Sequence, residues 1–205
     1  MPPYLHNLES ILRYLGMVTG LGTLVFIIIK AVIAQSRPAG LQTGKARQVL
    51  RTSYFLLASA FFLILAYFLF TPLPIQLSWP WSLVSTLLGA LILQAGVGLY
   101  LWGFHSLGQS FNVSSGFGVR LQAAHQLVTT GPYAWVRHPM YLAVIHACWG
   151  GLLLYRTWTM LLFAVMMIGL VYRARKEDEA LSQAFGADWE SYRARVPAWL
   201  PRIKR

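Results

Sequence analysis

The stretch SYFLLASAFFLILAYFLF at residues 53–70, followed after a short turn by WSLVSTLLGALILQAGVGLYLWGF at 81–104, decides the fold class. Both segments lie inside a run of 68 residues, 52–119, that contains no Asp, Glu, Lys or Arg. Such a run cannot cover a water-soluble fold, because a surface in contact with water carries many charged side chains. A membrane-spanning helix needs about 20 apolar residues, so the run predicts two membrane passes joined by a hairpin.

The composition of the whole chain agrees with this prediction. Hydrophobic residues make up 57% and charged residues 11%, whereas a soluble domain has about 25% charged residues. With 205 residues there is room for one compact bundle and for no sizeable extramembrane domain. We therefore predict an all-α integral membrane protein forming one domain over residues 1–205. The predicted passes are 14–34, 53–70, 81–104, 139–155 and 158–172.

The charges predict an orientation. The net charge is +11, and the basic residues fall at the ends of the apolar segments rather than on a separate face, so a nucleic-acid partner is not predicted. The connections 36–51 and 105–138 and the C-terminal tail hold almost all Lys and Arg, while the turn at 71–80 holds none. The positive-inside rule then places the N-terminus outside and the C-terminus in the cytoplasm, in the plasma membrane if the source is prokaryotic. The first apolar stretch is too long for a signal-peptide core and is interpreted as a retained helix.

Some residues inside the passes are interpreted as packing features. His146 is predicted to be a neutral imidazole bonded to a neighbouring helix, although an ionisable residue in a membrane is also a functional candidate. Small residues allow helices to approach closely. Close helix contacts are predicted at glycines in the first and third passes: Gly16, Gly20, Gly89, Gly96, Gly98 and Gly103.

The segment HQLVTTGPYAWVRHPMY at 125–141 concentrates unusual residues. Gly131-Pro132 is a turn signal, and Arg137-His138-Pro139 stands where the fourth apolar helix begins. A helix N-terminus offers free N–H groups that suit a carboxylate or a phosphate. The aromatic side chains of the segment suit a planar ring. The alternative interpretation is an interfacial loop with a headgroup-binding arginine and membrane-surface aromatics.

A second unusual segment follows the fifth pass. Five of the six acidic residues lie between Glu177 and Glu190. On a helix, residues four apart share one face, so one stripe would carry two charges and two apolar side chains: Arg173, Glu177, Leu181 and Phe185. The two charges either pair with each other or hold opposite charges on a zwitterionic ligand and its acceptor.

The end of the chain predicts a short additional helix. Gly186 is expected to end the preceding helix, and Trp189, Tyr192 and Val196 then share one face. Trp189 and Trp199 are interpreted as membrane-surface anchors. The sequence contains no GxGxxG after a strand, no P-loop and no G-x-S-x-G elbow. It also has no His/Cys cluster with metal-ligand spacing, so no metal is predicted.

In LVTTGPYAWVRHPMY (127–141) and RARKEDEALSQAFGADWESYRARVPAWLPRI (173–203), the sequence resembles the isoprenylcysteine carboxyl methyltransferase and phospholipid methyltransferase superfamily of integral membrane enzymes. The resemblance covers about the C-terminal 40% of the chain. It implies S-adenosylmethionine bound in a cytoplasmic pocket formed by residues 105–205, with a lipid acceptor entering from the membrane. The usual Glu-Glu pair of the family is Glu177-Asp178 here.

The resemblance also implies roles for particular residues. Glu177 corresponds to the cofactor-binding acid of the family and Arg173 to its acceptor-binding arginine. Further cofactor contacts are implied for His125, Gln126, Leu127, Val128, Tyr133, His138, Pro139, Met140 and Tyr141. The favoured activity is O-methylation of an isoprenylcysteine-like carboxylate. The alternatives are N-methylation of a phospholipid amine, with His125 or His138 as base, an NADPH-dependent reductase of the sterol type, and a non-catalytic membrane protein.

Overall fold

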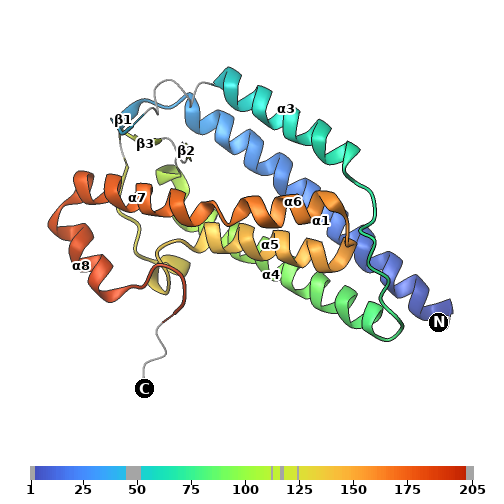
Figure 1. Ribbon diagram of the computed structural model, residues 1–205. Helices are drawn as coiled ribbons and strands as arrows, with labels where there is room; N and C mark the ends of the chain where they lie inside the picture. Colours follow the sequence, from blue (N-terminus) through green and yellow to red (C-terminus); the bar gives the residue numbers. More distant parts are fainter. Residues whose placement is uncertain (1–2, 45–51, 112, 116–117, 124, 202–205) are drawn as a thin grey trace.

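A computed structural model describes residues 3–44, 52–111, 113–115, 118–123 and 125–201. Helices dominate it, which confirms the predicted all-α membrane class (Figure 1). The helices are α1 (Pro3–Gln35), α3 (Thr52–Phe68), α4 (Trp81–Leu107), α5 (Pro139–Tyr155), α6 (Trp158–Met167), α7 (Leu170–Phe185) and α8 (Ala187–Arg195), with short 3₁₀ turns η1 (Gly108–Ser110) and η2 (Gly131–Ala134).

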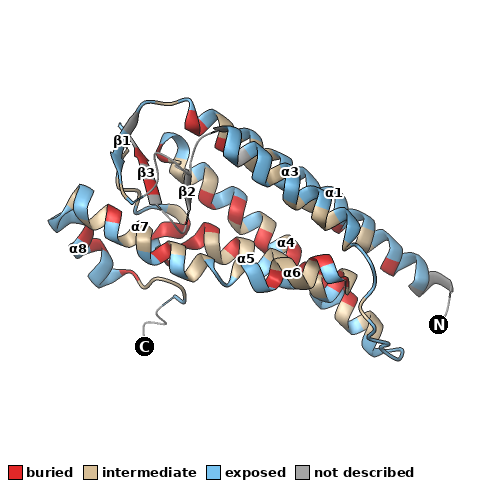
Figure 2. Cartoon of the chain, turned by 45° about the horizontal axis from the view of Figure 1, so that its top comes forward, coloured by how far each residue is buried: buried red, intermediate tan, exposed pale blue. Residues whose placement is uncertain are grey.

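Within the described part of the chain, three helical segments are long and apolar enough to cross a membrane: His6–Gln35, Trp81–Ser110 and Trp158–Phe185. Two shorter apolar helices accompany them, Leu56–Phe68 and Pro139–Tyr155. All five predicted passes thus fall on apolar helices, although five complete crossings stay a prediction. The faces of α1 and α3 are largely exposed (Figure 2) although they are apolar, as expected of helices in contact with lipid.

The connections between helices contain a small sheet that the sequence did not predict. Val119 and Leu121 of its central strand are buried and pack against Ala180 of α7. The three strands are antiparallel in the order β1-β3-β2 and are only three to five residues long, which is too short for a clear alternating pattern. They are β1 (Ala39–Gln42), β2 (Val113–Ser115) and β3 (Gly118–Gln122).

The helices α4 and α5 pack closely because glycines meet at their crossing. A Cβ atom on Gly96 would lie 2.7 Å from the Ala143 carbonyl oxygen, and one on Gly89 would lie 2.8 Å from the Gly150 carbonyl oxygen. Only a residue without a side chain fits there. The predicted close contacts are therefore confirmed at four positions (Gly16, Gly89, Gly96, Gly103), whereas no atom lies within 4 Å of the corresponding point at Gly20 and Gly98.

Two side chains differ from their sequence interpretation. His146 Nδ1 lies 2.8 Å from the Leu142 carbonyl oxygen of its own helix, not of a neighbouring helix. Trp189 is not a membrane-surface anchor, because it is only 1% exposed and packs with Tyr192 and Val196. The reason is that α8 folds back, so its apolar face meets the loop and α7 instead of lipid. The predicted end of α7 before Gly186 is confirmed.

Candidate functional site

Three segments meet at the end of the bundle that carries the sheet: the loop 125–138, the helix α7, and α8 with the residues after it (Figure 1). The loop turns at Gly131, whose φ of 62° lies in the left-handed region, which glycine adopts without steric cost. After this turn, η2 leads to His138, the N-cap residue of α5, and Pro139 occupies the first turn of that helix. A proline is favoured there because its missing N–H would have no helical partner.

One face of α7 presents Glu177 and Arg173 to Tyr141, the third residue of α5. The Tyr141 hydroxyl donates a hydrogen bond to Glu177 Oε2 over 2.6 Å. The Arg173 guanidinium carbon lies 5.0 Å from the centre of the Tyr141 ring. A carboxylate and a guanidinium one helical turn apart therefore share a single tyrosine. This face can hold a cation at Glu177 and an anion at Arg173.

His125 and Tyr133 belong to the same cluster, because the charge of Glu177 acts on both. Burial lowers the pKa of His125, and the Glu177 charge only partly offsets that effect, so the imidazole is neutral. Burial raises the pKa of Tyr133 well above its ordinary value, and Glu177 raises it further. The backbone of Ser110 also raises the pKa of His125, though by less than burial lowers it. His125 Nδ1 is buried and has no hydrogen-bond partner among the described residues, so this ring nitrogen can still form a hydrogen bond with a ligand.

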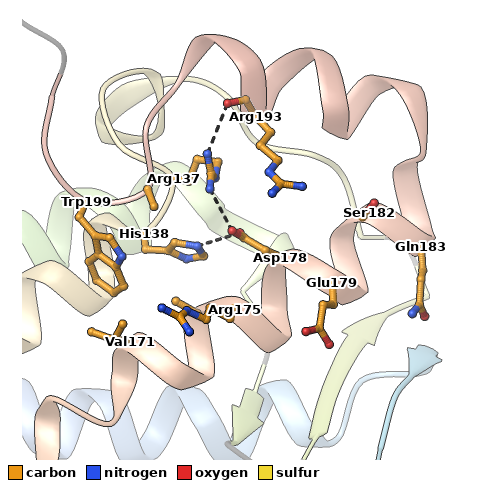
Figure 3. A pocket seen from close by; sticks show the side chains of 12 residues that line it. Arg137, His138, Val171, Arg175, Asp178, Glu179, Ser182, Gln183, Arg193 and Trp199 are labelled. Atoms are coloured by element: carbon orange, nitrogen blue, oxygen red, sulfur yellow. Dashed lines mark hydrogen bonds and ion pairs between the residues drawn. The ribbon is translucent and has the colours of Figure 1, made fainter.

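The next residue on α7, Asp178, points to a different set of partners. Figure 3 shows its carboxylate between His138 and Arg137, with His138 Nε2 at 2.8 Å from Oδ1 and Arg137 Nη2 at 3.0 Å from Oδ2. The His138 ring stacks on Tyr141, with ring centres 5.6 Å apart and planes 11° apart. Since Tyr141 also binds Glu177, the two neighbouring acids are connected through one histidine and one tyrosine.

The tail after α8 is fixed onto this loop by main-chain bonds. The Arg137 N–H donates to the Pro197 carbonyl over 2.9 Å, and the His138 N–H donates to Ala198 over 3.2 Å. The Tyr192 hydroxyl donates to the Tyr133 carbonyl over 2.7 Å. Burial raises the pKa of Tyr192, so its hydroxyl stays protonated and remains a donor. The tail therefore covers the loop.

The other residues that were predicted to contact the cofactor lie in several different surroundings. Leu127 packs against the Trp189 and Tyr192 cluster of the tail, and Met140 packs against Tyr100 in the bundle. The backbone N–H of Gln126 donates to Ser110 Oγ, while Gln126 itself is exposed. Val128 is half-buried and Pro139 is fully buried. The structure thus places the side chains of His125, Tyr133, Tyr141, Arg173 and Glu177 together and turns those of Leu127 and Met140 into the core.

Sequence reasoning missed two residues of this region. Asp178 was noted only as a departure from a Glu-Glu pair, yet it joins Arg137 and His138. The sequence did contain a signal for this difference. Neighbouring residues on a helix point about 100° apart, so Glu177 and Asp178 cannot contact the same side chains. Tyr192 was assigned to an apolar face, and its hydroxyl bond to Tyr133 has no sequence signal.

These features define a class of protein: a helical membrane protein whose loop and C-terminal tail enclose a charged, aromatic-lined cluster. The model of the phospholipid methyltransferase family matches residues 84–188, about half of the chain, and includes this cluster. The chain belongs to the phospholipid methyltransferase family.

Individual relatives agree with the family. Mouse protein-S-isoprenylcysteine O-methyltransferase is 33% identical over 108 residues, which cover 46% of this chain and 35% of the relative. The Saccharomyces cerevisiae enzyme of the same name is 30% identical over 122 residues, covering 58% and 50%. The nickel-cobalt-cadmium resistance protein NccN of Alcaligenes xylosoxydans xylosoxydans is 35% identical over 80 residues, covering 38% and 37%. The chain thus spans between about a third and a half of the length of these relatives.

Proposed function

We propose that this site transfers a methyl group from S-adenosylmethionine to a lipophilic acceptor in the membrane. The observation that carries the proposal is the position of Glu177, whose carboxylate is held by Tyr141 beside His125 and Tyr133 within the family-matched region. The abundance of Lys and Arg in residues 173–205 supports a cytoplasmic location for this end of the bundle.

The residues present fit the proposed cofactor. S-adenosylmethionine supplies a methyl group that is already activated by its sulfonium. The Glu177 carboxylate would bind the positive charges of the cofactor, because among the described residues its one hydrogen bond comes from the neutral Tyr141 hydroxyl, which leaves other lone pairs for the ligand. His125 Nδ1, which is buried and has no hydrogen-bond partner in the described part of the chain, offers one polar contact. The covering tail would exclude water, and the loop and α7 would hold the reacting atoms in line.

Arg173 supports a carboxylate as the acceptor. Its guanidinium lies one turn from Glu177 and against the Tyr141 ring, and it can hold a carboxylate by two parallel hydrogen bonds. A carboxylate oxygen would form a C–O bond to the methyl carbon while the C–S bond breaks. The negative charge of the oxygen and the positive charge of the sulfonium disappear together, so no proton has to move. Relatives named for isoprenylcysteine O-methylation favour this acceptor.

A phospholipid amine is the second candidate acceptor, and the name of the matched family favours it. Methylation of an amine releases a proton, so a base is required. His125 is neutral because burial lowers its pKa, and its Nδ1 has no hydrogen-bond partner among the residues that the structure describes. It is the residue of the cluster best suited to accept that proton.

Titration of S-adenosylhomocysteine into the purified full chain, followed by calorimetry, tests cofactor binding. We expect saturable heat for the wild type and at least tenfold weaker binding for Glu177→Gln, because a hydrogen bond to a charged group is lost. Glu179→Gln is the matched control, since Glu179 pairs with Lys176 at the surface. The absence of saturable heat in a folded sample would overturn the proposal, as would saturable binding of NADPH instead.

Turnover of a methyl-labelled cofactor distinguishes the acceptors. A farnesylated cysteine with a free carboxylate should be labelled, and Arg173→Ala should abolish labelling while leaving S-adenosylhomocysteine binding within twofold. Labelling of phosphatidylethanolamine vesicles instead, lost in His125→Gln, would favour the amine.

A further inference from the structure

The face of α7 opposite Glu177 borders a cavity of about 630 Å³. It is lined by residues of α7, of α8 and of the segment after α8, together with Arg137 and His138. The α7 residues at 171, 174, 175, 178, 179, 182 and 183 line it, whereas 173, 177 and 181 do not. These two sets lie on opposite sides of the helix, because each residue advances about 100° around its axis. The cavity therefore lies on the other side of α7 from Glu177, and His138, which lines the cavity, stacks on Tyr141 of the Glu177 cluster.

The charges around this cavity leave an excess of positive charge. Asp178 is neutralised by Arg137 at 3.0 Å, and Glu179 is paired with Lys176 at 2.9 Å. Arg175 has no hydrogen-bond or ion-pair partner among the described residues. In the described part of the chain, the Arg193 guanidinium has one ion-pair contact, at 3.7 Å from the exposed Glu190.

The two available arginines come from opposite walls. Figure 3 shows Arg175 extending from α7 beneath His138 and Trp199, while Arg193 reaches toward the cavity from α8. Planar guanidinium groups match the oxygens of a phosphate, which can be held by two such groups at once. The cavity is therefore suited to a phosphate oxyanion.

Apolar residues border the same cavity on one side. Val171 and Trp199 line it, and Tyr172 and Leu200 beside them are exposed. α7 follows the apolar helix α6, so this edge lies where the apolar helix passes into the charged tail. Lipid phosphates and interfacial tryptophans occupy that level in a bilayer. This arrangement favours a lipid over a free anion.

We propose that this cavity binds the phosphate of an anionic membrane phospholipid, held by Arg175 and Arg193 with Trp199 against the glycerol region. The lipid would fix α7 and the tail at the membrane surface. This inference does not depend on the proposed methyl transfer, because none of the three residues belongs to the Glu177 cluster.

The test uses the purified full chain in a neutral detergent at low salt, with thermal stability as readout. Dihexanoyl phosphatidylglycerol should stabilise the wild type in a saturable way, and the zwitterionic dihexanoyl phosphatidylcholine should need at least tenfold more. Arg175→Gln and Arg193→Gln should each raise the midpoint concentration about fivefold. Arg195→Gln is the matched control: it removes an exposed arginine of α8 that does not line the cavity, and should change the midpoint less than twofold.

Four results would overturn the proposal. An equal loss in Arg195→Gln would indicate diffuse charge attraction, and equal midpoints for the two lipids would exclude charge recognition. Saturable stabilisation by inorganic phosphate that the lipid cannot displace would indicate a free anion site. Displacement of the lipid by S-adenosylhomocysteine would make the cavity part of the cofactor site. Failure of the chain to bind S-adenosylhomocysteine would leave the lipid result unaffected.

Discussion

Glu177 and Asp178 are neighbours in the sequence, but they have opposite surroundings. Asp178 accepts hydrogen bonds from Arg137 and His138, two residues of the loop that also hold the tail. Glu177 accepts a bond from the neutral Tyr141 hydroxyl. The positive charge available to Asp178 comes from the protein itself, whereas Glu177 has lone pairs left for a ligand. Asp178 thus holds the two loop residues to which the tail is bonded. Glu177 keeps acceptor positions that a ligand can use.

The two acids are also connected, and Tyr141 is the connection. Its hydroxyl binds Glu177, its ring stacks on His138, and Arg173 lies against the same ring. A change at the Asp178 face should therefore reach the Glu177 face through the orientation of Tyr141. The comparison predicts that variants of Asp178 act first on stability, and that variants of Glu177 act first on binding.

The largest effect is expected for Asp178→Ala. Arg137 and His138 are nearly buried, with side chains 10% and 4% exposed, and the substitution leaves them without their carboxylate. Removal of one partner of a buried ion pair costs about 3 kcal/mol. Thermal unfolding and limited proteolysis should show lower stability and a released tail, while Glu177→Gln should keep the stability of the wild type. Equal protease resistance of the tail in Asp178→Ala and wild type would contradict this assignment.

Gly131→Ala should damage both faces together, at a cost of about 2 kcal/mol. A Cβ atom there would overlap the Ser106 hydroxyl, and φ is 62°. Both stability and S-adenosylhomocysteine affinity should fall, because the turn places Tyr133 for one face and Arg137 for the other. Adding Ser106→Ala removes the overlapping oxygen and should restore part of the loss. No restoration would show that backbone strain alone is responsible.

Tyr141→Phe should sharpen the comparison, because it removes the bond to Glu177 and keeps the ring. We expect about tenfold weaker S-adenosylhomocysteine binding in calorimetry, because Glu177 loses the hydrogen bond that orients its carboxylate. The unfolding temperature should remain close to that of the wild type, since the stacking on His138 is retained. Tyr67→Phe, a change on an exposed residue of α3, is the control. A large loss of stability with unchanged binding would reverse the roles given to the two faces.

The helices of this fold were predictable, and so was one face of the site. Apolar runs of the required length identified α3, α4 and α5, since a bilayer permits few alternatives. The spacing of four between Arg173 and Glu177 placed both on one face of α7, and the structure shows both at Tyr141. These are local signals, which depend on periodicity and on residue type alone.

The partners of Asp178 and the small sheet depend on contacts between distant segments. β1 pairs with β3 across about eighty residues, and no property of either short strand specifies the other. Two adjacent acids look equivalent in composition, and only the position of the loop distinguishes them. Trp189 resembled a membrane anchor for the same reason, because its burial depends on how α8 folds back.

The smallest expected effect is a change in how stability depends on pH, and it arises from His125 on the Glu177 side of the site. Burial lowers the pKa of His125 in the folded chain, with Glu177 opposing only in part, so the unfolded chain binds the proton more readily. The contribution of neutral His125 to stability is complete above the ordinary pKa of about 6.5 and is lost as the pH falls below that value toward the folded pKa. Unfolding temperatures measured between pH 7.5 and 5.5 should fall less in His125→Gln than in the wild type.

The control is His105→Gln, at an exposed histidine of α4, which should keep the wild-type dependence of the unfolding temperature on pH. An unchanged dependence in His125→Gln would show that this imidazole is not buried in its neutral form. Because the charges of Glu177 and His125 act on each other, the same acidification should weaken cofactor binding at Glu177 through His125.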